Sequence, residues 1–294
     1  MTSMSKTVIF FGTDTFSATA LKSLIEAQYS IGAVVTKPDS KSGRGQRLTS
    51  PLVKQIAEQH NIPVWQPAKL IDIIDDIKEF DDPIGVLSSY GRIIPQAIID
   101  LFIPGIINIH PSLLPLYRGP SPIETAILNG DTRTGVSIMK LTAEMDAGPI
   151  YAQEVYELDG SETAPQLYEE LSALGGRMLI ETLPGIIEGN ILASPQANAA
   201  IYCYLLKKED AYINPEEITA VEAERHIRAF LSFPKTKLTL LDQSVIVTKA
   251  HVSSEKVSAL DIAFKDGQFL SIDELIGPSG RNMSGTDFLN GYTN

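Results

Sequence analysis

The first two-thirds of the chain alternates short apolar runs with longer amphipathic stretches. Apolar runs followed by turn-forming residues predict buried strands at residues 8–11, 31–36, 84–88, 106–110 and 150–155. An amphipathic stripe follows Ser50 and Pro51, residue types favoured at the N-cap and in the first turn, and predicts a helix from Pro51. A long helix is predicted over residues 164–188. This alternation predicts a parallel sheet with helices on both faces.

The pattern changes after residue 189. Residues 190–204 lack a repeating apolar period and contain several turn-forming residues, which predicts a linker. Beyond it, a helix is predicted over 219–231 and strands at 236–241, 245–251, 259–264 and 268–275. Closely spaced strands with tight turns, such as Asp266-Gly267, predict a small barrel. The sequence therefore divides into residues 1–189, a linker at 190–204, and residues 205–294.

Composition narrows the class of protein. The 294 residues suit two domains, and no apolar run approaches the roughly 20 residues that would span a bilayer. The single cysteine, Cys203, excludes an internal disulfide. The four histidines lack the spacing typical of metal ligands, so we expect no metal. We expect a cytoplasmic monomer.

Charge is distributed unevenly along the chain. The formal net charge is −12, which disfavours a polyanionic partner, yet residues 37–54 carry five basic residues against Asp39 alone, a local charge of +4. The basic positions are Lys37, Lys41, Arg44, Arg47 and Lys54. A solvated charged loop is the ordinary explanation. Its length, beyond the usual range of about two to six residues, and its glycines, which make it flexible, favour a loop with a function.

The candidate chemistry lies at the end of the apolar run at residues 106–110. Asn108 and His110 are two apart, so a strand places both side chains on one face, and Pro111 ends the strand. Open parallel sheets bind ligands at this carboxyl edge. With Asp146, the pair offers an amide donor, a proton carrier and a carboxylate, which suits chemistry at an acyl carbon. Isolated residues of these types are more often structural, so the trio alone leaves both interpretations open.

The surrounding sequence resembles the folate-dependent formyltransferases. The likeness is carried by His110-Pro111-Ser112-Leu113-Leu114-Pro115-Leu116-Tyr117-Arg118-Gly119 and by Thr134-Gly135-Val136-Ser137-Ile138-Met139. It extends from Phe11-Gly12-Thr13 to the segment at residues 283–289. Within the family, the chain is most similar to members that act on methionyl-tRNA. The resemblance implies an α/β fold: a Rossmann-like, parallel-sheet formyltransferase domain followed by a small oligonucleotide-binding-like β-barrel domain that binds tRNA.

The resemblance also implies an activity and the residues that perform it. A formyl group would pass from 10-formyltetrahydrofolate to the α-amino group of methionyl initiator tRNA, for translation initiation. Asn108 and His110 would stabilise the oxyanion, and Asp146 would support proton transfer through His110. The folate site would comprise Arg92, Ile93, Ile94, Ser112, Leu113, Leu114 and Pro115. The tRNA acceptor stem would meet Lys37, Lys41, Arg44 and Arg47.

Two alternatives stay open. Residues 205–294 carry a net charge of −3, which favours a formyltransferase acting on a small amine, such as a sugar nucleotide or glycinamide ribonucleotide. The second is a non-catalytic folate- or nucleic-acid-binding protein, although a binder has no evident need for the whole trio. The segment Phe11-Gly12-Thr13-Asp14 lacks both the Walker and the Gly-x-Gly-x-x-Gly patterns, which disfavours ATP and NAD, and Asp14 stands where the family usually has proline.

Overall fold

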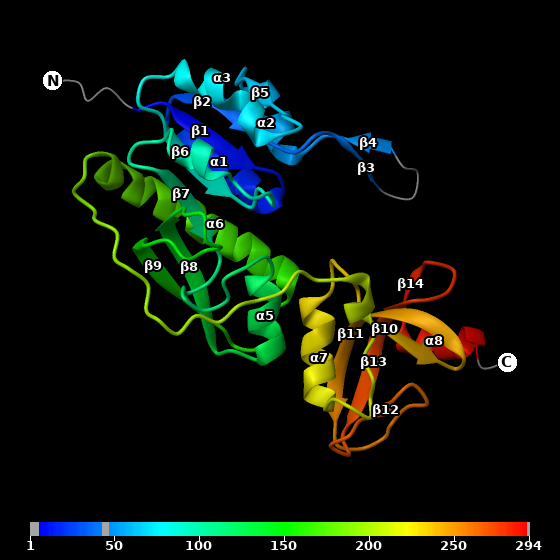
Figure 1. Ribbon diagram of the computed structural model, residues 1–294. Coiled ribbons are helices and arrows are strands. Elements are labelled where there is room, and N and C mark those ends of the chain that lie inside the picture. Colours follow the sequence, from blue (N-terminus) through cyan, green and yellow to red (C-terminus); the bar gives the residue numbers. More distant parts are fainter. Residues whose placement is uncertain (1–5, 43–46, 293–294) are drawn as a thin grey trace. The chain divides into compact units, whose positions relative to one another are not determined.

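The computed structural model describes residues 6–42 and 47–292, with only the backbone described at Ser42 and Arg47 (Figure 1). The chain folds into two compact units. The first comprises residues 1–120, 134–156 and 168–202, and the second comprises residues 121–133, 157–167 and 203–294. None of the helices in the described part of the chain combines the length and hydrophobicity needed to cross a bilayer.

A seven-stranded sheet forms the centre of the first unit, in the order β5-β2-β1-β6-β7-β8-β9. Its strands are β1 (Val8–Gly12), β2 (Ile31–Val35), β5 (Val64–Trp65), β6 (Ile84–Ser88), β7 (Ile106–His110), β8 (Arg133–Lys140) and β9 (Ile150–Glu157). The strands from β5 to β7 pair in parallel, as the apolar pattern predicts. The strand β8 was not predicted, and it pairs antiparallel with β7, so the sheet is parallel over only part of its width.

Helices cover both faces of this sheet, which confirms the predicted layers. On one face lie α1 (Thr15–Glu26), α2 (Leu52–Gln59) and α6 (Ala164–Ile187); on the other lie the 3₁₀-helix η1 (Leu70–Ile73), α3 (Ile74–Lys78) and α4 (Gln96–Ile99). Gly175 allows α6 to approach closely, because a Cβ there would lie 2.6 Å from the side chain of Ile109 in β7. Central strands such as β1, β6 and β7 are therefore buried along their whole length.

The start of α2 differs from the prediction. Pro51 occupies the N-cap itself with non-helical backbone, and the helix begins at Leu52 without a side-chain cap. Ser50 instead donates its hydroxyl to Asp39 at 3.1 Å. Lys54 forms an ion pair with the same carboxylate at 2.9 Å, and hydrogen bonds from Gln66 and Lys54 lower the pKa of Asp39. The polar residues before and within α2 thus hold the base of the basic loop.

The basic loop is a hairpin. Its strands β3 (Ser40–Ser42) and β4 (Arg47–Thr49) pair antiparallel, with Lys41 opposite Leu48. Arg44, predicted to contact tRNA, lies outside the described residues, as does the side chain of Arg47. Lys41 lies on β3 and is exposed. The base of the loop therefore has regular backbone, which the sequence pattern did not predict.

The second unit is built on an antiparallel sheet. Its strands β10 (Lys237–Leu240), β11 (Gln243–Ser253), β13 (Phe269–Ile276) and β12 (Ile262–Ala263) are neighbours in that order, and β14 (Asn282–Ser284) pairs with β13. Its helices are α5 (Pro122–Asn129), η2 (Lys208–Ala211), α7 (Ala220–Ala229) and α8 (Gly285–Tyr292). Apolar side chains from the sheet, α7 and α8 form one core, in which Phe288 is fully buried. The short strands and the helix before them were predicted; β14 and α8 were not.

Candidate active site

The strand β7 places Asn108 and His110 on one face of the sheet, as their spacing predicts. Leu87 of β6 pairs with Asn108, and the two side chains share the face covered by η1, α3 and α4. Asn108 is 4% exposed and His110 is 5% exposed. Both polar side chains are therefore held in a largely dry environment at the carboxyl edge of the parallel strands.

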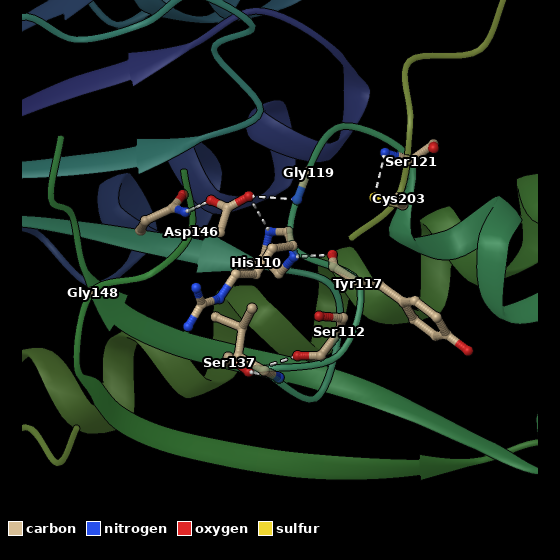
Figure 2. A network of polar contacts seen from close by, with 12 residues as sticks. His110, Ser112, Tyr117, Gly119, Ser121, Ser137, Asp146, Gly148 and Cys203 are labelled. Atoms are coloured by element: carbon tan, nitrogen blue, oxygen red, sulfur yellow. Dashed lines mark hydrogen bonds and ion pairs between the residues drawn. The ribbon is translucent and has the colours of Figure 1, made fainter. Parts of the chain in front are cut away.

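The carboxylate of Asp146 meets both residues (Figure 2). The side-chain amide of Asn108 donates to one carboxylate oxygen at 3.5 Å, and the Nδ1 atom of His110 lies 3.8 Å from the other oxygen. The backbone N–H of Gly119 donates to that second oxygen at 2.8 Å. The three residues predicted to be catalytic, which are 38 positions apart at their extremes, thus form one contact network.

The imidazole of His110 is oriented from both sides. Its Nε2 atom lies 2.9 Å from the carbonyl oxygen of Tyr117, and its Nδ1 atom faces the carboxylate of Asp146. Both nitrogens therefore face oxygen acceptors, whereas a neutral imidazole has a single N–H to donate. This arrangement suits a ring that gains and releases a proton in place. Tyr117 and Gly119 contribute backbone groups, so their side chains gave no sign of these roles in the sequence.

The loop from Ser112 to Leu116 is held by hydroxyl groups. Ser112 donates its hydroxyl to the carbonyl of Leu116 at 2.6 Å, and Ser137 of β8 donates to the carbonyl of Ser112 at 2.6 Å (Figure 2). Ser137 also accepts the N–H of Leu114 at 3.1 Å. Ser112 and Leu114 are buried, while Leu113 and Pro115 are partly exposed. Of the four residues predicted to bind folate here, Ser112 and Leu114 thus form hydrogen bonds that hold the loop.

The second predicted folate segment follows β6 and is held by the loop after β1. Thr13 donates its hydroxyl to the carbonyl of Tyr90 at 3.0 Å, and Ser89 donates to the carboxylate of Asp14. Asp14 also accepts the N–H of Ser17, so it caps α1. Its carboxylate thus satisfies a backbone N–H at the helix start that would otherwise be available to an anion.

The side chains of this second segment point in different directions. Arg92 donates to the carbonyl of Pro67 at 3.1 Å, Ile93 is 84% exposed, and Ile94 is buried. Lys37, predicted to contact tRNA, lies beside this segment, because a Cβ on Gly91 would collide with its ammonium group. Lys37 and Lys41 are therefore in different surroundings, although both belong to the basic loop.

A cavity of about 360 Å³ lies next to the start of β7, where Gly105, Phe102 and Lys140 are among its lining residues. None of the residues predicted to act in catalysis, folate binding or tRNA binding lines it. It adjoins the opposite end of β7 from His110. We therefore assign it no part in the reaction.

Two protein-family models match the chain and identify the family to which it belongs. The model described as formyl transferase matches residues 5–183, and the model described as formyl transferase, C-terminal domain, matches residues 205–293. The chain belongs to the formyl transferase family. The predicted Rossmann-like unit followed by a small antiparallel β unit is the fold observed.

Relatives and solved structures of this family extend along most of the chain. Methionyl-tRNA formyltransferase of Chloroflexus aurantiacus is 41% identical over 84% of this chain and 80% of its own length. The enzyme of the same name from Lactobacillus delbrueckii is 37% identical over 97% of this chain and 94% of its own.

Two solved structures share the fold at lower identity. HypX from Aquifex aeolicus in complex with tetrahydrofolic acid has a TM-score of 0.69 and 16% identity, over 99% of this chain and about half (48%) of that longer chain. An N-formyltransferase from Helicobacter canadensis, in complex with folinic acid and dTDP-3-aminofucose, has a TM-score of 0.67 and 20% identity, over 92% of this chain and 99% of its own. At these identities the likeness concerns the fold.

Proposed function

We propose that this chain transfers the formyl group of 10-formyltetrahydrofolate to the α-amino group of methionyl initiator tRNA. The neutral amine forms the new C–N bond at the formyl carbon, and the bond from that carbon to the folate nitrogen breaks. The amine loses one proton and the folate nitrogen gains one. Catalysis requires a group that stabilises negative charge on the formyl oxygen and a group that relays the proton.

The contact network of Asn108, His110 and Asp146 carries this proposal. The amide of Asn108 supplies a neutral donor for the formyl oxygen, and His110 supplies a donor whose proton can move. Asp146 lies against both, and its charge stabilises the protonated form of the ring during the transfer. No side chain is required to form a covalent bond with the substrate. Ser112 is excluded as a nucleophile by its commitment to the Leu116 carbonyl.

Exposed apolar side chains on the segments after β6 and β7 and next to Asp146 in the sequence fit the flat rings of a folate. Ile93 is 84% exposed on the segment after β6, Met145 is 54% exposed beside Asp146, and Leu116 is 38% exposed after β7. Large apolar groups left in water on adjoining loops favour a ligand with apolar faces. The backbone between Tyr90 and Ile94, fixed by Thr13 and Arg92, offers N–H and C=O groups for the polar edge of the pterin.

Two observations support tRNA as the acceptor. The relatives that match most of the chain are named methionyl-tRNA formyltransferases. The hairpin of β3 and β4 carries Lys41, which is exposed, and Arg44 lies between the two strands in the sequence. Lysine and arginine on a projecting loop position nucleic acids through phosphates. We assign this contact to Lys41, Arg44 and Arg47, and Lys37 to the surroundings of the folate loop.

The acidic charge of the chain is the observation that favours a small amine instead. In the second unit, Arg228 pairs with Glu224 at 2.7 Å, so its charge is already balanced, and Arg225 donates to the carbonyl of Asn129 at 3.5 Å. A formyl-transfer assay with 10-formyltetrahydrofolate decides between the acceptors when charged initiator tRNA and a UDP-aminosugar are offered in parallel. Transfer to the aminosugar alone would replace the proposed substrate, and no transfer to either would favour a binding protein.

A further inference from the structure

Gln196, in the segment that follows α6, is bonded to the loop that carries Asp146. Its side-chain N–H groups donate to the backbone carbonyls of Asp146 and Gly148, both at 2.7 Å. Its side-chain oxygen accepts two hydrogen bonds from Arg118, at 3.1 Å from Nε and 2.8 Å from Nη2. Every donor of this amide is used, and each bond to the loop flanks the carboxylate that meets His110.

The loop around Asp146 requires such support. Asp146 has a φ of +46°, a left-handed conformation that is unfavourable for residues other than glycine and persists where neighbouring contacts enforce it. Gly148 has no room for a side chain, because a Cβ would collide with the carbonyl of Lys140. The backbone path from Asp146 to Gly148 is therefore determined by its contacts, among which the two from Gln196 are the shortest.

Arg118 is itself fixed, which makes Gln196 a rigid support. Arg118 is 8% exposed, its Nη1 donates to the hydroxyl of Tyr202 at 3.3 Å, and its guanidinium lies 5.8 Å from the centre of that ring. Its backbone N–H donates to the carbonyl of Ile201 at 2.9 Å. The next residue, Gly119, donates to the Asp146 carboxylate. Residues 118–119 thus hold the carboxylate directly and the loop backbone through Gln196.

We propose that Gln196, held by Arg118, is a positioning residue that sets the Asp146 carboxylate against His110 and Asn108. This inference rests on the proposed function, in which Asp146 acts through His110. Gln196 touches no reacting atom, so its removal should alter turnover and leave substrate binding intact. A misplacement of about 1 Å in an active site can cost on the order of 100-fold in rate.

The first test replaces the donor without changing the shape of the side chain. Gln196→Glu keeps an oxygen for Arg118 but turns a second oxygen toward two carbonyls. We expect kcat to fall by about 10- to 100-fold, with the KM for 10-formyltetrahydrofolate within about twofold of wild type. Asn198→Asp adds the same charge to an exposed position of the same segment and should leave both constants unchanged. A Gln196→Glu variant with wild-type kcat, or with its loss confined to KM, would overturn the proposal.

The second test separates this inference from the proposed function. Asp146→Ala removes the group that Gln196 is said to position, so Gln196→Glu should cause no further loss of kcat in that background. If Asp146→Ala keeps normal turnover, the proposed catalytic role of Asp146 is wrong. If Asp146→Ala is impaired and the two effects multiply, the catalytic role stands and the positioning role of Gln196 is wrong.

A third measurement does not depend on activity. The N–H of Gly119 donates to the Asp146 carboxylate, so its hydrogen exchange reports where that carboxylate lies. Gln196→Glu, and equally Gln196→Ala if the charged variant folds poorly, should accelerate exchange at Gly119 by at least several-fold. Exchange at Ile107, in the centre of β7, should not change. Unaltered exchange at Gly119 would show that the carboxylate stays in place without Gln196.

Discussion

Gly119 donates its backbone N–H to the carboxylate of Asp146 at 2.8 Å, on the oxygen that faces Nδ1 of His110. A charged acceptor makes such a bond stronger than a neutral pair would. This bond holds the carboxylate beside the imidazole, so in the proposed reaction the carboxylate stays in place and the proton moves on His110. Substitutions at Asp146 and at His110 should therefore both lower turnover.

We predict that His110→Ala and Asp146→Ala each lower turnover by two or more orders of magnitude. The reason is the loss of a group that stabilises the oxyanion or transfers the proton, for which losses of roughly 100- to 10,000-fold are usual. Single-turnover formyl transfer with charged initiator tRNA measures the effect. Folate affinity, measured by calorimetry, should survive His110→Ala. Near-normal turnover in either variant would contradict the assignment.

We predict that Thr13→Val weakens folate binding while Thr13→Ser does not. The hydroxyl of Thr13 holds the carbonyl of Tyr90, and valine keeps the shape of threonine without the donor. A buried carbonyl that loses its partner costs about 1 to 3 kcal/mol, part of which should appear as a higher KM for 10-formyltetrahydrofolate. Steady-state kinetics on both variants tests this. Equal KM values for the two variants would show that the Thr13 hydroxyl does not support folate binding.

We predict that changing Lys41, Arg44 and Arg47 together to Ala weakens tRNA binding and its dependence on salt. Each phosphate contact contributes roughly 0.7 to 0.9 to the slope of log affinity against log salt, so the slope should fall by about 2 to 3. Binding of charged initiator tRNA across a salt series measures it. The matched control changes Lys22, Lys69 and Lys78, which are exposed elsewhere on the first unit. Equal slopes for the two triple variants would favour the small-amine substrate.

We predict that acid destabilises the second unit through His226. Burial lowers the pKa of this residue to about 4, and its Nδ1 lies 3.0 Å from the hydroxyl of Thr236. The folded state therefore binds a proton less readily than the unfolded state, whose histidine titrates near 6.5. Stability is independent of this group above about pH 6.5 and falls as pH decreases toward 4. A shift from about 6.5 to about 4 corresponds to a full loss of at most on the order of 3 kcal/mol.

Histidine titration by NMR checks the origin of this effect directly. The imidazole of His226 should titrate near pH 4, well below the ordinary histidine value of about 6.5. Thermal unfolding of His226→Gln should show a smaller loss of stability between pH 7 and pH 5 than the wild-type chain does. If the two proteins lose stability in parallel, other groups govern the acid response.

Much of the fold followed from periodicity, because buried strands leave strong local patterns. The apolar run at 106–110 and the spacing of Asn108 and His110 placed both side chains correctly on one face of β7. The antiparallel pairing of β8 was missed, since strand direction depends on the route of the chain between strands and not on the strand sequence. At Ser50, the cap preference was overridden by Asp39, a partner eleven residues away.

Of the candidate site, the sequence predicted only the residues whose side chains carry reactive polar groups. Asn108, His110 and Asp146 are of that kind. Tyr117 and Gly119 act through backbone atoms, which every residue type possesses. Gln196 lies 50 positions from Asp146, in a segment whose composition indicated a linker. Such contacts join residues that are distant in the sequence or use backbone atoms, so local sequence patterns do not predict them.

The loop after β7 contains buried residues that hold its backbone and other residues that reach solvent. Ser112 and Leu114 are buried and bonded through Ser137, whereas Leu113 and Leu116 reach solvent. The inward pair fixes the shape of the loop, so the outward pair can be exchanged without reshaping the backbone. Libraries that aim to change ligand preference should therefore randomise Leu113 and Leu116 and keep Ser112, Leu114 and Ser137 constant.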